Sequence, residues 1–157
     1  MMKSFPAWSL VVLQFILIGL LVVLPAGNLW ARGAFLAVVA GGLVTVGIAI
    51  AYLGARRLGK TLTPSPIPRE GGELHTSGIY SSVRHPIYTG LLTGALGLAL
   101  WGGSTGHLIA LAALVGLIAV KARAEERMLL ATYSDYASYA SQVGRFVPGI
   151  GKLKGGV

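Results

Sequence analysis

Four long apolar runs joined by short polar connections constrain this chain more than any other feature of its sequence. The runs cover residues 7–26, 34–55, 86–101 and 107–120. The first two reach or exceed the ~20 residues that an α-helix needs to cross the hydrocarbon core of a bilayer. A content of 54% hydrophobic and only 11% charged residues is typical of integral membrane proteins and excludes an ordinary soluble domain. The sequence therefore predicts an all-α, polytopic membrane protein with about four transmembrane helices, in a single domain over residues 1–157.

The positions of the basic residues predict how these helices are oriented. The chain carries thirteen Lys and Arg residues and a formal net charge of +8. With four spans, twelve of the thirteen lie on the side of the two termini, and only Arg32 lies opposite. Because cytoplasmic loops are enriched in Lys and Arg, both termini are predicted to be cytoplasmic. This asymmetry also explains the charge without a nucleic-acid partner.

A cleaved signal peptide is the alternative interpretation of residues 1–26. Its apolar core would be about twice as long as usual, and Pro25-Ala-Gly27 is a poor cleavage site. We therefore favour a transmembrane helix for this segment.

The sequence also indicates where helices pack together and whether a metal ion is bound. The second run carries small residues at heptad-like spacing, and the third run carries glycines. They are Ala40, Val44, Gly47, Ala51 and Gly54, then Gly90, Gly94 and Gly97. Small residues on one face let helices approach closely, which predicts a packing surface, although Gly90 could instead admit a ligand. The chain has no cysteine, and His75 and His107 lack neighbours at ligand spacing, so no metal site is predicted.

Two connecting segments have distinct patterns. Residues 62–72 contain prolines at alternate positions, which favour an extended, polyproline-like course towards the third run. After Val120 the helical pattern continues through residues 123–139, with apolar and aromatic side chains at helical spacing. This segment predicts a C-terminal amphipathic helix that lies at the cytoplasmic face.

The third run begins with features of a helix start. Pro86 lacks an amide hydrogen and has its φ angle preset, which suits the first turn of a helix. His85 is then the predicted N-cap residue. The free amide groups of such a first turn, together with the helix dipole, attract anions.

The third and fourth runs are predicted to form a hairpin whose turn is centred on Ser104. His85 lies nineteen residues before this centre and Arg123 lies nineteen after it. At ~1.5 Å rise per residue, both fall at nearly the same height. The Arg84-His85 pair is therefore predicted to face residues 121–126 at the membrane interface, where clustered ionisable groups usually serve a function.

Two adjacent glutamates lie in that facing segment. Glu125 and Glu126 project ~100° apart on a helix, so only one of them easily faces the site. The other is predicted to be solvated or paired with Arg123 or Arg127.

At these residues the chain resembles the isoprenylcysteine carboxyl methyltransferase and phospholipid N-methyltransferase group. The pattern G-x-Y-x-x-x-R-H-P-x-Y-x-G of that group is present as Gly78, Tyr80, Arg84, His85, Pro86, Tyr88 and Gly90. Its partner motif is present as Glu125-Glu126. Leu129, Tyr136, Tyr139 and the Arg145-Phe-Val-Pro148 segment also fit, whereas Tyr133-Ser134 stands where members often carry Phe-Gly. The resemblance covers roughly residues 58–150.

The resemblance implies an integral membrane methyltransferase that uses S-adenosylmethionine. Residues 1–57 would form an N-terminal helix hairpin, and residues 58–150 would form the cofactor-binding and catalytic part. The implied cofactor-binding residues are Leu74, Gly78, Tyr80, Arg84, His85, Tyr88, Gly90, Glu125 and Glu126. Arg123 and Glu126 are the expected catalytic residues, and the site would lie on the cytoplasmic side.

The acceptor implied by the resemblance is a lipophilic small molecule or a lipid. A carboxylate acceptor needs a cation such as Arg123 or Lys121 to position it, whereas an amine needs Glu125 or Glu126 as a general base. Both sets are present, so both acceptor types stay open, as does the oligomeric state. The alternatives to an enzyme are a non-catalytic membrane module and a small four-helix transporter. A transporter is disfavoured because residues 7–26 and 34–55 contain no ionisable group at mid-span.

Overall fold

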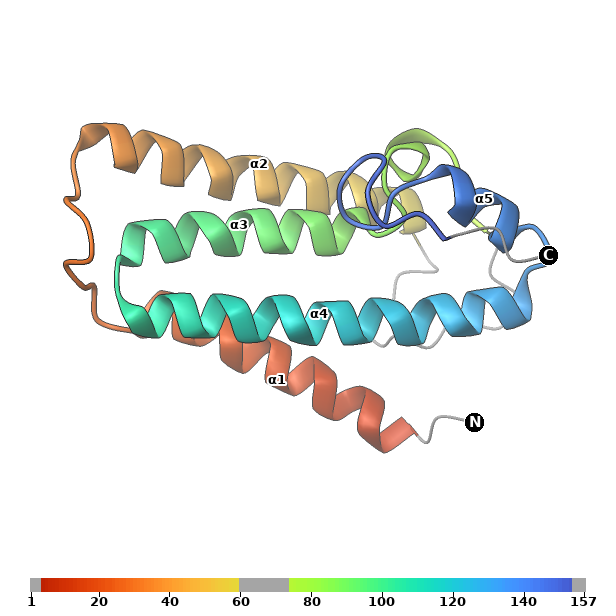
Figure 1. Cartoon of the computed structure of the whole chain (residues 1–157), viewed down its shortest axis with the longest axis horizontal. Helices are drawn as coiled ribbons and strands as arrows, with labels where there is room; N and C mark the ends of the chain where they lie inside the picture. The colour runs from red at the N-terminus through yellow and green to blue at the C-terminus, as the bar shows by residue number, and fades with distance from the viewer. Residues whose placement is uncertain (1–3, 60–73, 154–157) are drawn as a thin grey trace.

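The structure, a computed structural model that describes residues 4–59 and 74–153, is a bundle of helices with a small cap at one end (Figure 1). Its helices are α1 (Ser4–Val23), α2 (Ala34–Leu58), the 3₁₀ helix η2 (Gly78–Ser81), α3 (Pro86–Gly102), α4 (Thr105–Thr132) and α5 (Tyr136–Gln142). Figure 1 shows α3 between α2 and α4, with α1 crossing below α4. The cap consists of α5 and the segments beside η2. The predicted polyproline-like segment 62–72 lies outside the described residues.

The predicted apolar runs all form helices, and two of them meet the requirements for crossing a membrane. α2 and α4 are long and apolar enough to do so by length and composition, and Trp8–Val23 forms a shorter apolar helix. α3 has 17 residues, which corresponds to about 26 Å at ~1.5 Å per residue. The all-α architecture with apolar helices is therefore confirmed. By length and composition, two of the described helices qualify as membrane spans, so the predicted number of four spans is not confirmed.

The prediction of one C-terminal amphipathic helix is wrong, because residues 123–139 are divided between two helices. Residues 123–132 continue α4 without a break, and Tyr133 ends that helix with extended backbone (φ −120°, ψ 116°). The chain then turns back into α5, whose Tyr136 and Ala140 are buried in the protein. The aromatic side chain at 136 therefore packs in the interior of the cap and not along a membrane surface.

The predicted packing surface of small residues is confirmed between α2 and α3. A Cβ atom added at Gly47 would lie 2.5 Å from the Gly90 carbonyl oxygen, and one added at Gly90 would lie 2.5 Å from the Ala51 nitrogen. Another added at Gly97 would lie 2.6 Å from the Ala40 oxygen. The room left by the missing side chain of Gly90 is thus filled by α2.

A matched pair of glycines in α3 tests this packing. Gly90→Ala is expected to lower the free energy of unfolding by about 1–3 kcal/mol, because its methyl group overlaps α2. Gly94 has no neighbouring atom within 4 Å of an added Cβ, so Gly94→Ala should match or exceed the wild type, with a helix-propensity gain of about 1 kcal/mol. Thermal unfolding in detergent, followed by circular dichroism, measures both. Equal midpoints for the two variants would contradict the packing.

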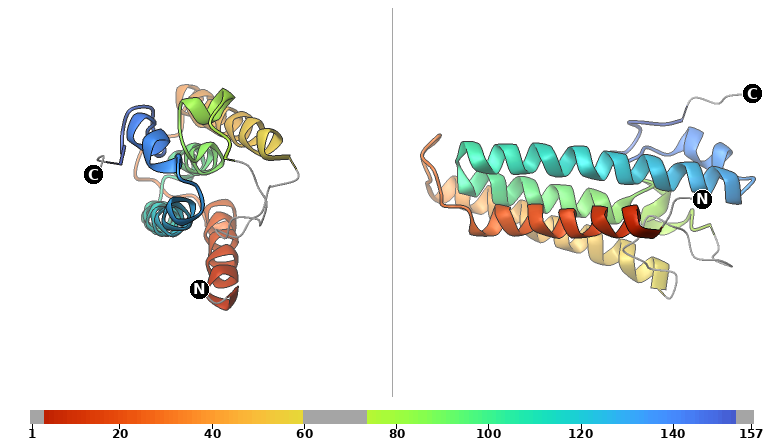
Figure 2. Two further views of the ribbon diagram at one scale, coloured as in Figure 1. Left: turned by 90° about the vertical axis from the view of Figure 1, so that its right-hand side faces the viewer. Right: turned by 90° about the horizontal axis from the view of Figure 1, so that it is seen from below.

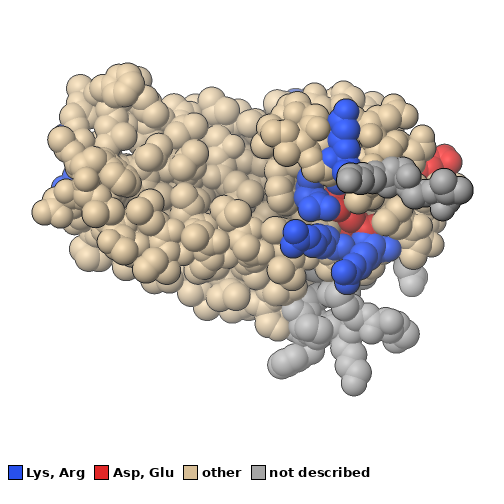
Figure 3. All heavy atoms as spheres, viewed as in Figure 1, with Lys and Arg blue, Asp and Glu red and all other residues tan. Residues whose placement is uncertain are grey.

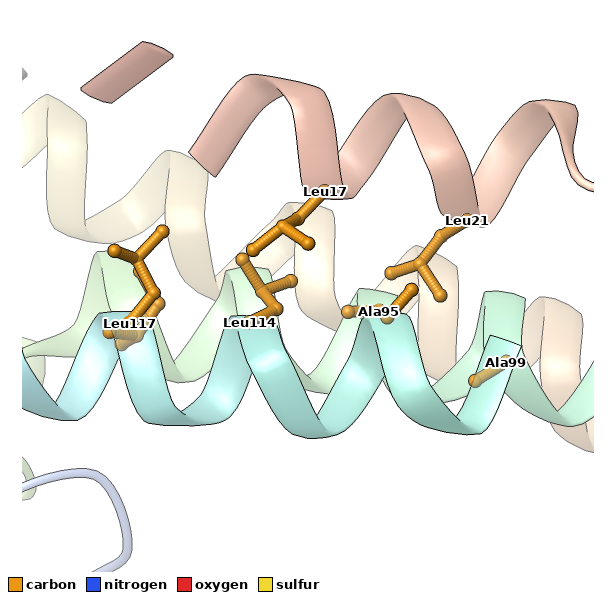
Figure 4. Packing of buried hydrophobic residues seen from close by; sticks show 8 residues of the cluster. Leu17, Leu21, Ala95, Ala99, Leu114 and Leu117 are labelled. Atoms are coloured by element: carbon orange, nitrogen blue, oxygen red, sulfur yellow. The ribbon is translucent and has the colours of Figure 1, made fainter. Parts of the chain in front are cut away.

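The other side of α3 forms the apolar core with α1 and α4. Leu17 and Leu21 of α1 pack towards Leu114 and Leu117 of α4, with the small side chains of α3 among them (Figure 4). α2, in contrast, presents large apolar side chains outward, such as Phe35 at 83% exposure. An apolar face of this kind is suited to contact with lipid.

The turn predicted around Ser104 is present and joins α3 to α4 at the end of the bundle away from the cap. α3 ends at Gly102, and Gly103 adopts the left-handed conformation (φ 57°) that glycine tolerates without strain. The Ser104 side chain then caps α4 by accepting a hydrogen bond from the His107 amide at 3.3 Å. His107 itself is buried, and its Nδ1 atom lies 2.7 Å from the Ser104 hydroxyl oxygen, which gives it a structural role.

Charged side chains gather at the capped end. Figure 3 shows Lys, Arg, Asp and Glu atoms concentrated on that part of the visible face, while the rest is largely uncharged. α2 ends, α3 begins and α4 ends near the cap, whereas α1 begins at the same end of the bundle but diverges from the cap (Figures 1 and 2). The helix ends that carry the predicted motifs are thereby brought together.

Candidate functional site

The site is built where two extended segments meet at the start of α3. Val83 and Gly144 form an isolated parallel β-bridge. The Arg84 amide donates to the Gly144 carbonyl at 2.9 Å, and the His85 amide donates to the Arg145 carbonyl at 3.1 Å. These bonds place the side chains of the Arg84-His85 pair beside α4 and the segment after α5.

Arg84 uses its whole guanidinium group to hold this cap. Its Nε and Nη2 atoms donate to Glu126 Oε1 at 3.0 and 2.7 Å. Nη1 donates to the carbonyls of Ala140, at 2.9 Å, and of Val143, and Nη2 also donates to the carbonyl of Gly151 at 3.0 Å. All five N–H donors of a guanidinium are therefore engaged, and the side chain is 0% exposed.

Glu126 is the carboxylate at the centre of the cluster. Besides Arg84, it accepts hydrogen bonds from Arg145, whose Nε lies 3.1 Å from both carboxylate oxygens and whose Nη2 lies 2.6 Å from Oε2. The Glu126 side chain is 4% exposed, whereas that of Arg145 is 20% exposed. Two arginines thus neutralise one buried carboxylate, a geometry that holds charged groups more firmly than neutral hydrogen bonds do.

His85 lies between the two adjacent glutamates. Its Nε2 atom is 3.3 Å from Glu126 Oε1, and its Nδ1 atom is 3.5 Å from Glu125 Oε2. The imidazole ring stacks on the ring of Tyr88, with centroids 5.4 Å apart and an interplanar angle of 14°, and tilts against Phe146. As predicted, His85 is the residue before the first turn of α3, but its side chain makes no capping hydrogen bond.

Glu125 differs from its neighbour in exposure and in partners. Its side chain is 30% exposed, and the Tyr88 side chain lies beside its carboxylate. Lys121 lies one turn earlier on α4 and interacts electrostatically with Glu125. The Lys121 ammonium is 5.5 Å from the centroid of the Tyr88 ring and donates to Gln14 Oε1 of α1 at 2.5 Å.

Three tyrosines pack together in the cap. The Tyr139 hydroxyl donates to the Tyr80 carbonyl at 2.5 Å, and burial raises the pKa of Tyr139 to about 12. Burial also raises the pKa of Tyr136, whose hydroxyl stays protonated at neutral pH and has no hydrogen-bond partner in the described part of the chain. A buried hydroxyl without a partner is costly, so this donor marks a position where a ligand or water can bind.

The remaining residues expected at the site have different environments. Tyr80 is buried and donates its hydroxyl to the Gly54 carbonyl at 3.4 Å, while Leu74 is half-buried. Gly78 is exposed in a left-handed conformation (φ 66°), next to the Arg57 side chain. Arg123 is exposed, and no hydrogen bond or ion pair joins it to the cluster within residues 74–153.

The predicted meeting of the Arg84-His85 pair with the glutamates is confirmed. The expectation that only one of the two glutamates faces the site is wrong, because His85 contacts both of them. The buried one, Glu126, pairs with Arg84 and Arg145. In the sequence Arg145 stands out only as part of a C-terminal motif, because its approach to Glu126 depends on the helix break at Tyr133. Gln14 was missed altogether, since a single glutamine in an apolar helix gives no sign of its partner.

Comparison with known families identifies the family of this chain. A profile of the phospholipid methyltransferase family matches residues 35–136, which include α2, α3, α4 and both glutamates. The match covers more than half of the chain, so the protein belongs to the phospholipid methyltransferase family. The class that this family defines is that of membrane methyltransferases.

A curated relative is known from Cupriavidus metallidurans. The chain is 35% identical to its cobalt-zinc-cadmium resistance protein CzcN over 91 residues. This alignment covers 55% of the present chain and 41% of the relative. No group of three or more His, Cys, Asp or Glu side chains that could hold a metal ion occurs within residues 4–59 and 74–153.

Proposed function

We propose that this protein transfers a methyl group from S-adenosylmethionine to a lipophilic acceptor at the membrane surface. The observation that carries this proposal is the arrangement of His85 between a locked carboxylate, Glu126, and a partly exposed one, Glu125. This arrangement lies within the part of the chain that matches the methyltransferase family.

Some polar groups of the cluster can still bind a ligand, and they suit the amino-acid end of the methyl donor. That end carries a carboxylate and an ammonium group. Arg145 Nη1 makes no hydrogen bond within the described residues, and its side chain is 20% exposed, so it can donate to a carboxylate. Glu125, at 30% exposure, can accept from an ammonium group. The Tyr136 hydroxyl supplies a further buried donor.

The other members of the cluster position these two groups. Arg84 has no donor left for a ligand, so we assign it to holding Glu126 and the cap. Glu126 in turn orients Arg145 and His85, and its two arginine partners remove it as a general base. His85 and Tyr88 form a stacked pair that holds Glu125 from two sides.

Methyl transfer needs little more from the protein than alignment. When bound, S-adenosylmethionine supplies an electrophilic methyl group on a sulfonium. The chain holds the donor's amino-acid end and aligns the acceptor nucleophile, and such positioning supplies about 7–11 kcal/mol of barrier lowering in favourable cases. A site at the membrane edge reaches acceptors that arrive from the bilayer.

The proposed topology places this site on the cytoplasmic side. α1 to α4 would each cross the membrane, with the cap, both termini and the charged cluster on one face. Arg32, in the connection between α1 and α2, would lie on the other face. The enrichment of Lys and Arg at the capped end supports this orientation.

Transfer of labelled methyl groups tests the proposed function. Purified protein in nanodiscs made from bacterial lipid extract is incubated with S-adenosyl-[methyl-³H]methionine, and the organic phase is counted. We expect protein-dependent incorporation, and a loss of about 100-fold or more in His85→Ala, since His85 touches both glutamates. Binding of the donor without transfer to any lipid or lipophilic acid would instead favour a non-catalytic membrane module.

A further inference from the structure

A short hairpin after α5 carries apolar side chains that the fold leaves exposed. Val147 and Ile150 are 50% and 66% exposed, although they belong to the end of the bundle where the charged side chains gather. Pro148 and Gly149 between them are exposed as well, and residues 146–151 contain no charged side chain. Adjacent exposed apolar residues at the polar end of a protein indicate contact with another surface.

The tip of this hairpin is a defined turn. The Ile150 amide donates to the Val147 carbonyl at 3.0 Å, which closes a four-residue β-turn. Pro148 in its second position and Gly149 in its third, with φ 78°, are the residues that a type II turn requires. Behind the turn, the Arg145 amide donates to the Ile150 carbonyl at 2.8 Å. The turn therefore holds its two aliphatic side chains in a fixed arrangement.

The hairpin runs along α3 towards the body of the bundle. The bridge between Val83 and Gly144 is parallel, so the segment that enters the hairpin has the same direction as the segment that enters α3. The Thr89 hydroxyl, in α3, donates to the Phe146 carbonyl at 2.8 Å. Figure 1 shows this dark blue segment reaching from the cap over the start of α3. The tip thus lies beside the first turns of α3.

Two features place the first turns of α3 at the edge of the bilayer. α3, with a length of about 26 Å at ~1.5 Å per residue, is shorter than the ~30 Å hydrocarbon core that it is proposed to cross. Thr89, one turn from its start, therefore lies below the membrane surface. Tyr52 of α2 lies at a similar height, since the nitrogen of its neighbour Ala51 is 2.5 Å from a Cβ added at Gly90. Tyr52 is 61% exposed, and tyrosine is enriched at membrane interfaces.

The backbone of the hairpin suits an apolar environment. Unpaired backbone groups are costly in lipid. Four carbonyl groups of the hairpin accept hydrogen bonds, and Pro148 has no amide hydrogen that needs a partner. The four belong to Arg145, Phe146, Val147 and Ile150. The hairpin can therefore enter the edge of a bilayer without leaving these carbonyls unpaired.

We propose that the tip of this hairpin, residues 147–150, inserts into the lipid leaflet beside the cap, at the boundary between head groups and acyl chains. Its partner is the bilayer itself. The two aliphatic side chains contact acyl chains, and the exposed Lys152 lies at the level of the lipid phosphates. Because Arg145 at the base of the hairpin binds Glu126, the insertion holds the candidate site at the membrane surface. The inference rests on the proposed topology, in which α3 crosses the membrane, and not on methyl transfer.

Site-directed spin labelling measures the depth of this tip. The chain contains no cysteine, so a single introduced cysteine carries the label. Val147→Cys and Ile150→Cys are labelled and placed in liposomes of phosphatidylcholine and phosphatidylglycerol. Collisions with oxygen, which concentrates in the bilayer, are compared with those of nickel ethylenediaminediacetate, which stays in water. We expect both labels to lie about 5–10 Å below the lipid phosphates.

Two further positions calibrate the measurement. Ala137→Cys labels an exposed residue of α5 in the same cap, and its label should lie above the phosphates. Ile48→Cys labels an exposed side chain in the middle of α2, and its label should lie deeper than those of the tip.

The outcomes separate the proposal from its alternatives. Tip labels that are as open to the nickel complex as the label at position 137 would overturn the insertion. Tip labels shielded from both reagents would also overturn it, because protein and not lipid would then cover the tip. A water-exposed label at position 48 would overturn it together with the proposed topology. The readout needs no turnover, so a failure of the proposed methyl transfer would not change this result.

Discussion

Glu126→Gln is expected to lower the free energy of unfolding by about 3 kcal/mol, because it leaves two guanidinium groups without their shared carboxylate. Arg84 is fully buried, and it joins α4 to the carbonyls at the end of α5 and beyond. The loss should therefore weaken the cap first. Thermal unfolding in detergent gives the change in stability, and limited proteolysis locates it after residue 132.

The neighbouring glutamate supplies the control for this variant. Glu125→Gln makes the same chemical change one residue away, at a side chain that is 30% exposed and bonded to no arginine in the described ranges. Its unfolding midpoint should fall by less than half of the change in Glu126→Gln, because glutamine keeps the size of the side chain and no guanidinium group loses a carboxylate. Equal destabilisation by both variants would show that Glu126 does not hold the cap.

Glu125→Gln has its large effect on the reaction instead. Hydrogen bonds to charged groups contribute about 1.5–3 kcal/mol, which corresponds to about a 10–100-fold rise in the KM for S-adenosylmethionine. We expect this rise because Glu125 is the partly exposed carboxylate proposed to accept from the donor's ammonium group. Initial rates of labelled methyl transfer at varied donor concentration give the KM.

A second measurement on Glu125→Gln, with the acceptor concentration varied instead, makes this test more specific. The KM for the acceptor should change less than threefold in Glu125→Gln, since Glu125 is assigned to the ammonium group of the methyl donor and not to the acceptor. An unchanged donor KM with a lower kcat would contradict the assignment and indicate that Glu125 acts on the acceptor. Such a result would favour a general base, as an amine acceptor requires.

The helices that position this site could be predicted from the sequence, because they depend on local patterns of residues. Apolar runs mark the helices, Pro86 fixes the start of α3, and Gly103 allows the turn that pairs α3 with α4. Once that hairpin is assumed, the helical rise alone places His85 level with the glutamates. The small residues of the second and third runs likewise predict packing surfaces, and the structure shows that these two surfaces pack against each other.

Contacts that depend on irregular backbone could not be predicted in this way. Arg145 reaches Glu126 only because α4 ends at Tyr133 and the chain turns back through α5. The Arg84 side chain reaches the Ala140 and Gly151 carbonyls for the same reason. Backbone carbonyls leave no trace in a sequence, so the full engagement of Arg84 becomes visible only in three dimensions.

The roles of the two glutamates illustrate the same limit. Helical geometry predicts that Glu125 and Glu126 point in different directions, but it does not say which one is buried. The structure buries Glu126 between two arginines and leaves Glu125 beside Tyr88 and His85. Arg123, at nearly the height predicted from the hairpin, lies on an exposed face of α4.

Calorimetric titration of the nanodisc-embedded protein with S-adenosylmethionine tests the central claim most directly. Our account predicts saturable binding with one donor molecule per chain, and loss of this binding in His85→Ala that unfolds at the wild-type temperature. Absence of binding in folded wild-type protein, or undiminished binding in His85→Ala, would contradict the assignment of this cluster as the methyl-donor site.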